Sequence, residues 1–137
     1  MKLIPLLGAF LLAGFLFVAA AARPGDTAAS IDHGKYLAEH VAMCIQCHTP
    51  RDEEGNLLLS QRFQGAPVPF VSPWPNSRWA NTAPSIAGLP QYTTDQAVKL
   101  LTTGISRTGQ SLRSPMPPFR MSESDARDII AYLKSLE

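Results

Sequence analysis

The chain has 137 residues, and its 12 lysines and arginines nearly balance its 11 aspartates and glutamates. A chain of this length folds as one small domain, and its near-zero net charge gives no indication of a nucleic-acid partner. It holds only two cysteines. If both bind a cofactor or a metal, none remains to form a disulfide.

The N-terminal 22 residues have the pattern of a secretory signal peptide. Lys2 supplies the positive charge, residues 3–18 are almost wholly apolar, and residues 19–22 supply the small side chains of a cleavage site. The apolar run is about as long as the shorter membrane-spanning helices, so an uncleaved anchor is the alternative. We expect a periplasmic or otherwise extracytoplasmic domain, in contact with a membrane only if this segment stays uncleaved.

Residues 23–30 are mostly small or polar and show no apolar periodicity, so we interpret them as a flexible lead. The domain itself is expected over residues 31–137. Its first helix is predicted over about residues 32–43, because four side chains recur there at helical spacing: Tyr36, Leu37, Val41 and Cys44.

This helix leads into the sequence Cys44-Ile45-Gln46-Cys47-His48, which is the attachment motif of a c-type haem. Residues three apart in a helical turn face the same side, so Cys44 and Cys47 can form thioethers with the two vinyl groups of one porphyrin. The imidazole of His48 would then be the proximal ligand of the iron. The motif therefore predicts one covalently bound haem c.

Two cysteines at this spacing also occur in thioredoxin-like redox pairs, in half of a zinc site and in short-loop disulfides. A zinc site would need two more ligands, and only His33 and His40 remain in the chain. A thioredoxin-like pair would follow a strand in a βαβ pattern, which the sequence lacks. We therefore favour haem attachment and expect His33 and His40 to be surface side chains.

Residues 49–90 hold seven prolines, which exclude a long helix or a central strand. An irregular segment of this length in a small domain is usually functional or wrapped around something, and the haem is the expected occupant. A tryptophan indole, from Trp74 or Trp79, could donate to a haem propionate, and Arg62 or Arg78 could pair with one. Simple packing is the alternative for each of them.

Two more helices are predicted from their capping residues. Thr93 and Gln96 form a capping box that begins the first, and Gly104 ends it as a C-cap. Ser122 with Asp125 begins the last helix in a similar way.

The last helix is expected to pack across the first. It carries one continuous apolar stripe, made of Ala126, Ile129, Ile130, Leu133 and Leu136. Tyr132 flanks this stripe, and Gly34, which lowers helix propensity, is its natural partner at a close crossing. The pattern therefore predicts an all-α domain whose first and last helices cross.

The sixth ligand of the iron is predicted to be Met116. Three prolines surround it: Pro115, Pro117 and Pro118. They restrict the backbone, so a weak thioether ligand loses little entropy when it binds. Met121 is the alternative methionine, an open sixth site is another possibility, and Met43 beside Cys44 is expected in the core.

With these motifs the chain resembles the class I c-type cytochromes over most of its mature length. The similar segments are Gly34-Lys35-Tyr36 before the haem motif, residues 83–89 followed by Tyr92-Thr93 and Gly104, and Met116-Pro117 followed by Ala131-Tyr132-Leu133. The resemblance implies the class I cytochrome c fold, in which long loops wrap one covalent haem, and it places the axial methionine at Met116. The layout is most similar to single-haem domains that accept electrons from periplasmic dehydrogenases.

We therefore expect an electron carrier and not an enzyme. With axial ligands His48 and Met116, it would shuttle single electrons between exported redox proteins, for example a periplasmic dehydrogenase and a terminal oxidase. A fixed subunit of a membrane or periplasmic dehydrogenase or oxidase complex is the alternative. An open-site peroxidase or ligand-binding protein would need a distal acid–base residue, and no histidine follows His48.

Charge is unevenly distributed near the predicted axial methionine. Residues 96–122 contain no acid and carry four cations, Lys99, Arg107, Arg113 and Arg120. If they surround the haem edge, they form a positive patch that would steer an acidic redox partner. Scattered, solvated arginines are the alternative.

Overall fold

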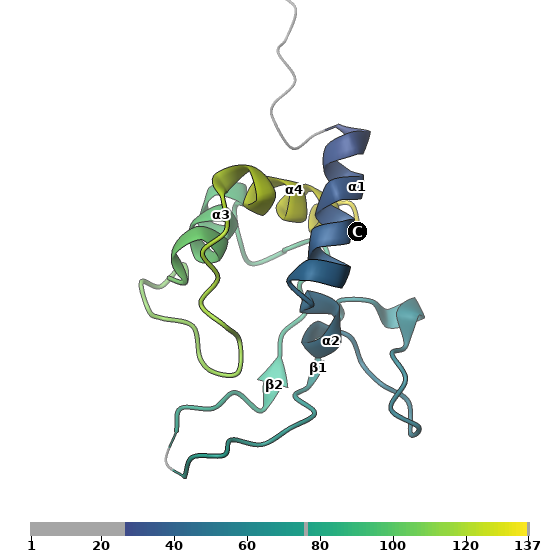
Figure 1. Cartoon of the computed structure of the whole chain (residues 1–137), viewed down its shortest axis with the longest axis vertical. Coiled ribbons are helices and arrows are strands. Elements are labelled where there is room, and N and C mark those ends of the chain that lie inside the picture. The colour runs from purple at the N-terminus through teal and green to yellow at the C-terminus, as the bar shows by residue number, and fades with distance from the viewer. Residues whose placement is uncertain (1–26, 76, 137) are drawn as a thin grey trace, which may run out of the picture.

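The structure, a computed structural model, describes residues 27–75 and 77–136 (Figure 1). Its helices are α1 (Ala28–Tyr36), the π-helix η1 (Leu37–Val41), α2 (Cys44–His48), the 3-10 turn η2 (Leu59–Gln61), α3 (Thr94–Thr103) and α4 (Glu123–Lys134). Two short strands, β1 (Ala66–Pro67) and β2 (Thr82–Ala83), pair antiparallel. The predicted all-α class is confirmed, with this short strand pair as an addition. The predicted signal peptide and residues 23–26 lie outside the described residues.

The first helix begins earlier than predicted. Thr27 is its N-cap, and the Thr27 hydroxyl accepts a hydrogen bond of 3.1 Å from the backbone N–H of Ser30. Residues 28–30, predicted as part of a flexible lead, are therefore helical. The start of the helix is set by this polar cap, and the apolar periodicity used for the prediction begins only later in the helix. The helix continues through η1, and Met43 interrupts it with a left-handed backbone (φ 54°) before α2 begins.

The first and last helices cross, as predicted (Figure 1). Gly34 is buried at the crossing, where a Cβ atom would lie 1.9 Å from the carbonyl oxygen of Asp128 and 2.9 Å from the backbone nitrogen of Ile129. The close approach is confirmed, but Gly34 meets the backbone of Asp128 and not Tyr132. His33 reinforces the crossing, because its Nδ1 lies 2.8 Å from Asp128 Oδ2.

The apolar stripe of α4 forms the centre of the core. Its buried members are Ala126, Ile129, Ile130 and Leu133, with Leu136 partly buried beside them. Tyr132 is also buried, donates its hydroxyl to Glu39 in η1, and meets the ring of Phe63 edge-on at 6.0 Å between centroids. Arg62 Nε lies 3.1 Å from Glu39 Oε1. This cluster joins α4 to η1 and to the irregular segment after α2.

The caps of α3 and α4 are those predicted. Thr93 and Gln96 exchange hydrogen bonds of 3.1 and 3.3 Å in a capping box, and Gly104, with φ 73°, ends α3. The Ser122 hydroxyl accepts from the N–H of Asp125 at the start of α4. Side chains thus replace the backbone partners that the ends of these helices lack.

The proline-rich segment after α2 is irregular, as predicted, but it is firmly anchored. The buried hydroxyl of Thr49 accepts from the N–H of Phe63, and the N–H of Gly65 donates to the carbonyl of His48 at 2.8 Å. The carbonyl of Phe63 in turn accepts from the N–H of Ile86 at 2.9 Å. These bonds satisfy buried backbone groups and hold the segment against the end of α2.

Candidate cofactor site

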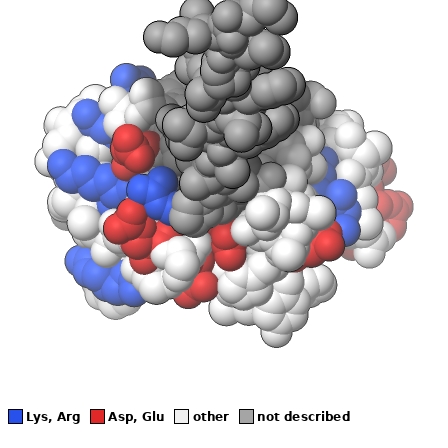
Figure 2. Space-filling view, turned by 90° about the horizontal axis from the view of Figure 1, so that it is seen from above, with Lys and Arg blue, Asp and Glu red and all other residues white. Residues whose placement is uncertain are grey.

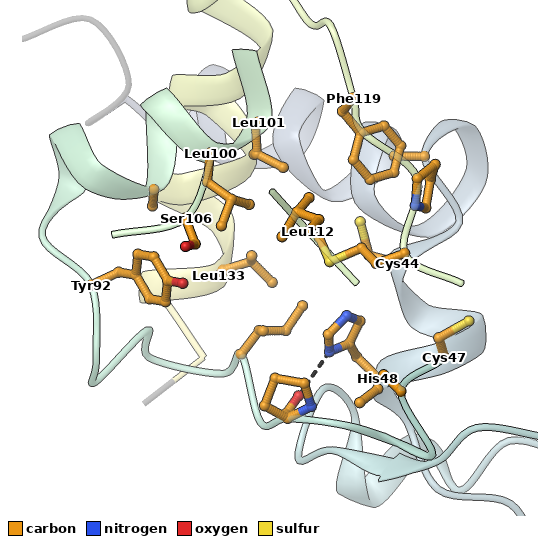
Figure 3. A pocket seen from close by; sticks show the side chains of 18 of the residues that line it. Cys44, Cys47, His48, Tyr92, Leu100, Leu101, Ser106, Leu112, Phe119 and Leu133 are labelled. Atoms are coloured by element: carbon orange, nitrogen blue, oxygen red, sulfur yellow. Dashed lines mark hydrogen bonds between the residues drawn. The ribbon is translucent and has the colours of Figure 1, made fainter. Parts of the chain in front are cut away.

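A cavity of about 610 Å³ opens beside α2 and is lined by residues of α2, α3, α4 and the loop that precedes α4 (Figure 3). This volume lies within the range of about 300–1,000 Å³ that is usual for cofactor sites. The lining is mostly apolar, and its labelled apolar members in Figure 3 are Leu100, Leu101, Leu112, Phe119 and Leu133. An apolar cavity of this size suits a large hydrophobic group.

Cys44, Cys47 and His48 all line this cavity from α2 (Figure 3). The two cysteines are one helical turn apart and are not joined in a disulfide. Burial raises the pKa of Cys44 to about 11, so its thiol is protonated at neutral pH. Because neither cysteine is committed to a disulfide, both remain free to react with one group that occupies the cavity.

The ring of His48 is fixed by a backbone carbonyl. Its Nδ1 lies 2.7 Å from the carbonyl oxygen of Pro84, the contact drawn as a dashed line in Figure 3. A carbonyl accepts only, so Nδ1 carries the proton and Nε2 keeps a lone pair for a metal. Burial lowers the pKa of His48, although the bond to Pro84 opposes this shift, and the ring is neutral at physiological pH. Sequence reasoning missed Pro84, which lies 36 residues away across an irregular segment.

Met116 lines the same cavity as His48. The backbone turns at this residue, because its N–H donates to the carbonyl of Arg113 at 3.2 Å. Met121, the alternative ligand, packs against the hydrophobic core and is not among the residues that line the cavity. Met43 also lines the cavity and is 46% exposed, so the expectation of a core position for it is wrong.

The described structure contains no set of ligands for the alternative zinc site. Across residues 27–75 and 77–136, no group of three or more histidine, cysteine or acidic side chains could hold a metal ion. His33 and His40 are exposed, as expected, and the His40 ring lies 5.7 Å from that of Tyr36. None of the helices in the described part has the length and apolar character needed to span a bilayer.

A family model described as Cytochrome c matches residues 31–137. The chain belongs to the cytochrome c family. The match includes the Cys44–His48 motif, the cavity-lining loops, α4 and the C-terminal two thirds of α1, and the predicted class I fold is confirmed. No curated protein matches the chain at the significance required. Membership of this family implies covalently bound haem c and electron transfer through it.

The residues of this cytochrome fit such a haem. Cys44, Cys47 and the neutral imidazole of His48, with its fixed tautomer, all line one cavity, and most of that lining is apolar. Neutral imidazole is a common ligand of haem iron, and its hydrogen-bonded Nδ1 is the usual means of orienting it. The donor set therefore matches the group that the family implies.

Three of the predicted propionate contacts are not at this cavity. Arg62 pairs with Glu39, and the indole N–H of Trp79 donates to the carbonyl of Phe70 at 3.3 Å. Neither side chain lines the cavity, and neither does Trp74, which is 69% exposed. These contacts depend on the path of the irregular segment, which the sequence pattern does not specify.

Proposed function

We propose that this cytochrome carries single electrons by means of one haem c, attached through Cys44 and Cys47 and ligated by His48 and Met116. When bound, the haem supplies an iron that alternates between the ferric and ferrous states. The observation that carries the proposal is the convergence of all four side chains on one apolar cavity.

The protein's contribution is to hold both axial side chains in place. The bond from His48 to Pro84 fixes the imidazole, and the prolines beside Met116 restrict the loop that presents the thioether. If the same two side chains stay bound in both oxidation states, the protein rearranges little when an electron arrives or leaves. The apolar lining limits water at the site and favours the less charged, reduced state.

The cavity lining also supports a carrier over a peroxidase. General acid–base catalysis at an open sixth site is usually carried out by a histidine or a carboxylate on the distal side. The residues that line the cavity include no aspartate or glutamate, and His48 is their one histidine. Reduced protein that bound carbon monoxide at once, with no lag for displacement of a ligand, would favour the open-site reading.

Covalent attachment is tested by replacing the cysteines. The Cys44→Ala, Cys47→Ala double variant should retain no haem after extraction with acidified acetone, whereas wild-type protein should keep all of it. Each single variant is the matched control and should keep haem through one thioether. Haem retained by the double variant would refute attachment through these residues.

The charge distribution supports redox proteins with acidic surfaces as partners. Asp95 is the one acidic residue between Gly55 and Ser122, and this range supplies most of the cavity lining. The face seen in Figure 2, by contrast, mixes acidic and basic side chains. Arg107 lies over the ring of Tyr92, a cavity-lining residue, at 5.8 Å. Cations around the cavity would speed encounter with an acidic partner.

We infer an extracytoplasmic location from the signal-peptide pattern of residues 1–22. In that compartment the electron donor would be a dehydrogenase and the acceptor a terminal oxidase, as the similarity to dehydrogenase-serving cytochrome domains suggested. Accumulation of the mature protein in the periplasmic fraction, with a shortened N-terminus, tests the location.

A specific observation also favours the fixed-subunit alternative. Val71, Trp74 and Phe70 are 85%, 69% and 49% exposed in the loop between β1 and β2, which projects from the domain (Figure 1). Clustered exposed apolar side chains mark interaction sites. A fixed subunit would elute from gel filtration of a native extract in a large haem-containing complex, and Trp74→Ser would release it. A free carrier would elute at its own mass.

A further inference from the structure

The tip of the loop between β1 and β2, residues 69–75, presents a run of apolar side chains to solvent. The exposed apolar residues are Pro69, Phe70, Val71, Pro73, Trp74 and Pro75. None of them belongs to the hydrophobic core or lines the cofactor cavity. The loop projects from the domain, as Figure 1 shows. The tip is therefore an apolar surface that the proposed haem site does not use.

Hydrogen bonds within the loop hold the tip in shape. The Ser72 hydroxyl accepts from the N–H of Trp74 at 3.1 Å and donates to the carbonyl of Trp74 at 2.9 Å. The indole N–H of Trp79 donates to the carbonyl of Phe70, and the rings of Trp79 and Phe70 meet edge-on at 6.0 Å between centroids. Because the tip is already ordered, little entropy is lost when its side chains bind another surface.

The composition of the tip favours a lipid surface. Three of its seven residues, Pro69, Pro73 and Pro75, have no backbone N–H. An N–H that loses its water without gaining another acceptor costs free energy in an apolar medium. The tip therefore carries fewer donors that require water than an ordinary loop of its length. Trp74 adds a ring of the kind that is enriched where a bilayer meets water.

The charge near the tip complements anionic lipid headgroups. Residues 55–94 contain no aspartate or glutamate, although the chain has 11 acidic residues. Arg62 in this range pairs with Glu39, whereas Arg78 is exposed and lies four residues beyond Trp74. A cation beside an apolar tip attracts an anionic membrane surface, and the lack of carboxylates removes the opposing repulsion.

We propose that residues 69–75 insert into the surface of an anionic phospholipid bilayer, with Arg78 at the level of the headgroups. The ends of the loop reach the cofactor site, because Val68 and Ala80 both line its cavity. Docking through the tip would therefore hold the cavity near the membrane. The protein would then meet membrane-bound redox partners by diffusion along the bilayer. The inference concerns the protein surface and does not depend on which side chains ligate the iron.

The test is co-sedimentation of the haem-loaded mature protein, residues 23–137, which contains the whole of the described core. The vesicles are made of phosphatidylethanolamine and phosphatidylglycerol. Trp74→Ser should lower the partition coefficient about tenfold, because an exposed apolar side chain no longer enters the bilayer. Tyr36→Ser is the matched control, since it removes an exposed aromatic side chain from α1 and should partition like wild type.

A second pair of variants tests the contribution of charge. Arg78→Gln should weaken binding to these vesicles about fivefold, and it should make no difference with neutral phosphatidylcholine vesicles. Lys35→Gln, which removes an exposed cation from α1, is the matched control and should leave binding unchanged. Equal losses in Arg78→Gln and Lys35→Gln would show a response to net charge alone and would refute the role of Arg78.

Two results would overturn the membrane assignment. Wild-type protein that stays in the supernatant with anionic vesicles would refute it, and so would equal partitioning of Trp74→Ser and wild type. If Trp74→Ser partitions like wild type but is released from a large complex in a native extract, the tip binds a protein instead of lipid. Neither result bears on the electron carrier, because the cysteine variants test haem attachment separately.

Discussion

The crossing of α1 and α4 makes Gly34→Ala the most informative stability variant. The added Cβ would lie 1.9 Å from the carbonyl oxygen of Asp128, so the two helices must separate by about 1.5 Å to restore ordinary contact. Overpacking of a core costs about 1–3 kcal/mol, and alanine recovers about 1 kcal/mol of helix propensity. Because the obstacle is backbone and cannot change rotamer, we expect the overpacking cost to lie at the upper end, which gives a net loss of about 2 kcal/mol in the free energy of unfolding.

Urea denaturation of the haem-loaded protein, followed by far-UV circular dichroism, measures this loss. Lys35→Ala is the control, since it alters an exposed neighbour in the same helix and should change stability by less than about 0.5 kcal/mol. Ile129, next to the obstructed carbonyl, lines the haem cavity, so Gly34→Ala should also perturb the haem absorbance. A Gly34→Ala protein as stable as wild type would show that the helices do not approach this closely.

Three further outcomes are expected. Thr93→Ala removes one half of the capping box of α3 and should lower the free energy of unfolding by about 1 kcal/mol in the same assay. Tyr132→Phe leaves the buried carboxylate of Glu39 without its hydroxyl donor and should cost about 1–3 kcal/mol. Burial and the bond to Glu39 raise the pKa of Tyr132. The stabilisation that its neutral hydroxyl gives to the fold is therefore present below about pH 10 and is lost at higher pH. The loss of stability at alkaline pH should therefore be smaller in Tyr132→Phe. Stopped-flow rates of electron transfer to a purified acidic redox protein should fall as salt rises, and a flat dependence would remove the steering role of the cations.

The elements that the sequence predicted are those with a local or periodic signature. The apolar stripe of α4, the caps at Thr93 and Ser122, and the Gly34 crossing all depend on residues a few positions apart, or on a requirement that only glycine meets. The Cys44–His48 motif is local in the same sense. Cys44, Cys47 and His48 reach one cavity because α2 is a short helix of five residues.

The features that the sequence did not predict depend on contacts across the irregular segment. The carbonyl of Pro84 reaches His48 only because the segment folds back onto α2, and the backbone of any residue could have served there. Arg62 was a reasonable propionate partner by charge, but the path of the chain brings it to Glu39. The early start of α1 after its N-cap Thr27 and the left-handed backbone of Met43 have no periodic sequence pattern either.

The proposed function depends most on ligation of the haem iron by both His48 and Met116, and the optical spectrum of the oxidised protein tests this directly. Wild type and Met121→Ala should both show the methionine–iron charge-transfer band, and Met116→Ala should lack it while keeping covalent haem. A band that survives in Met116→Ala and disappears in Met121→Ala, or that is absent from the wild-type protein, would contradict it.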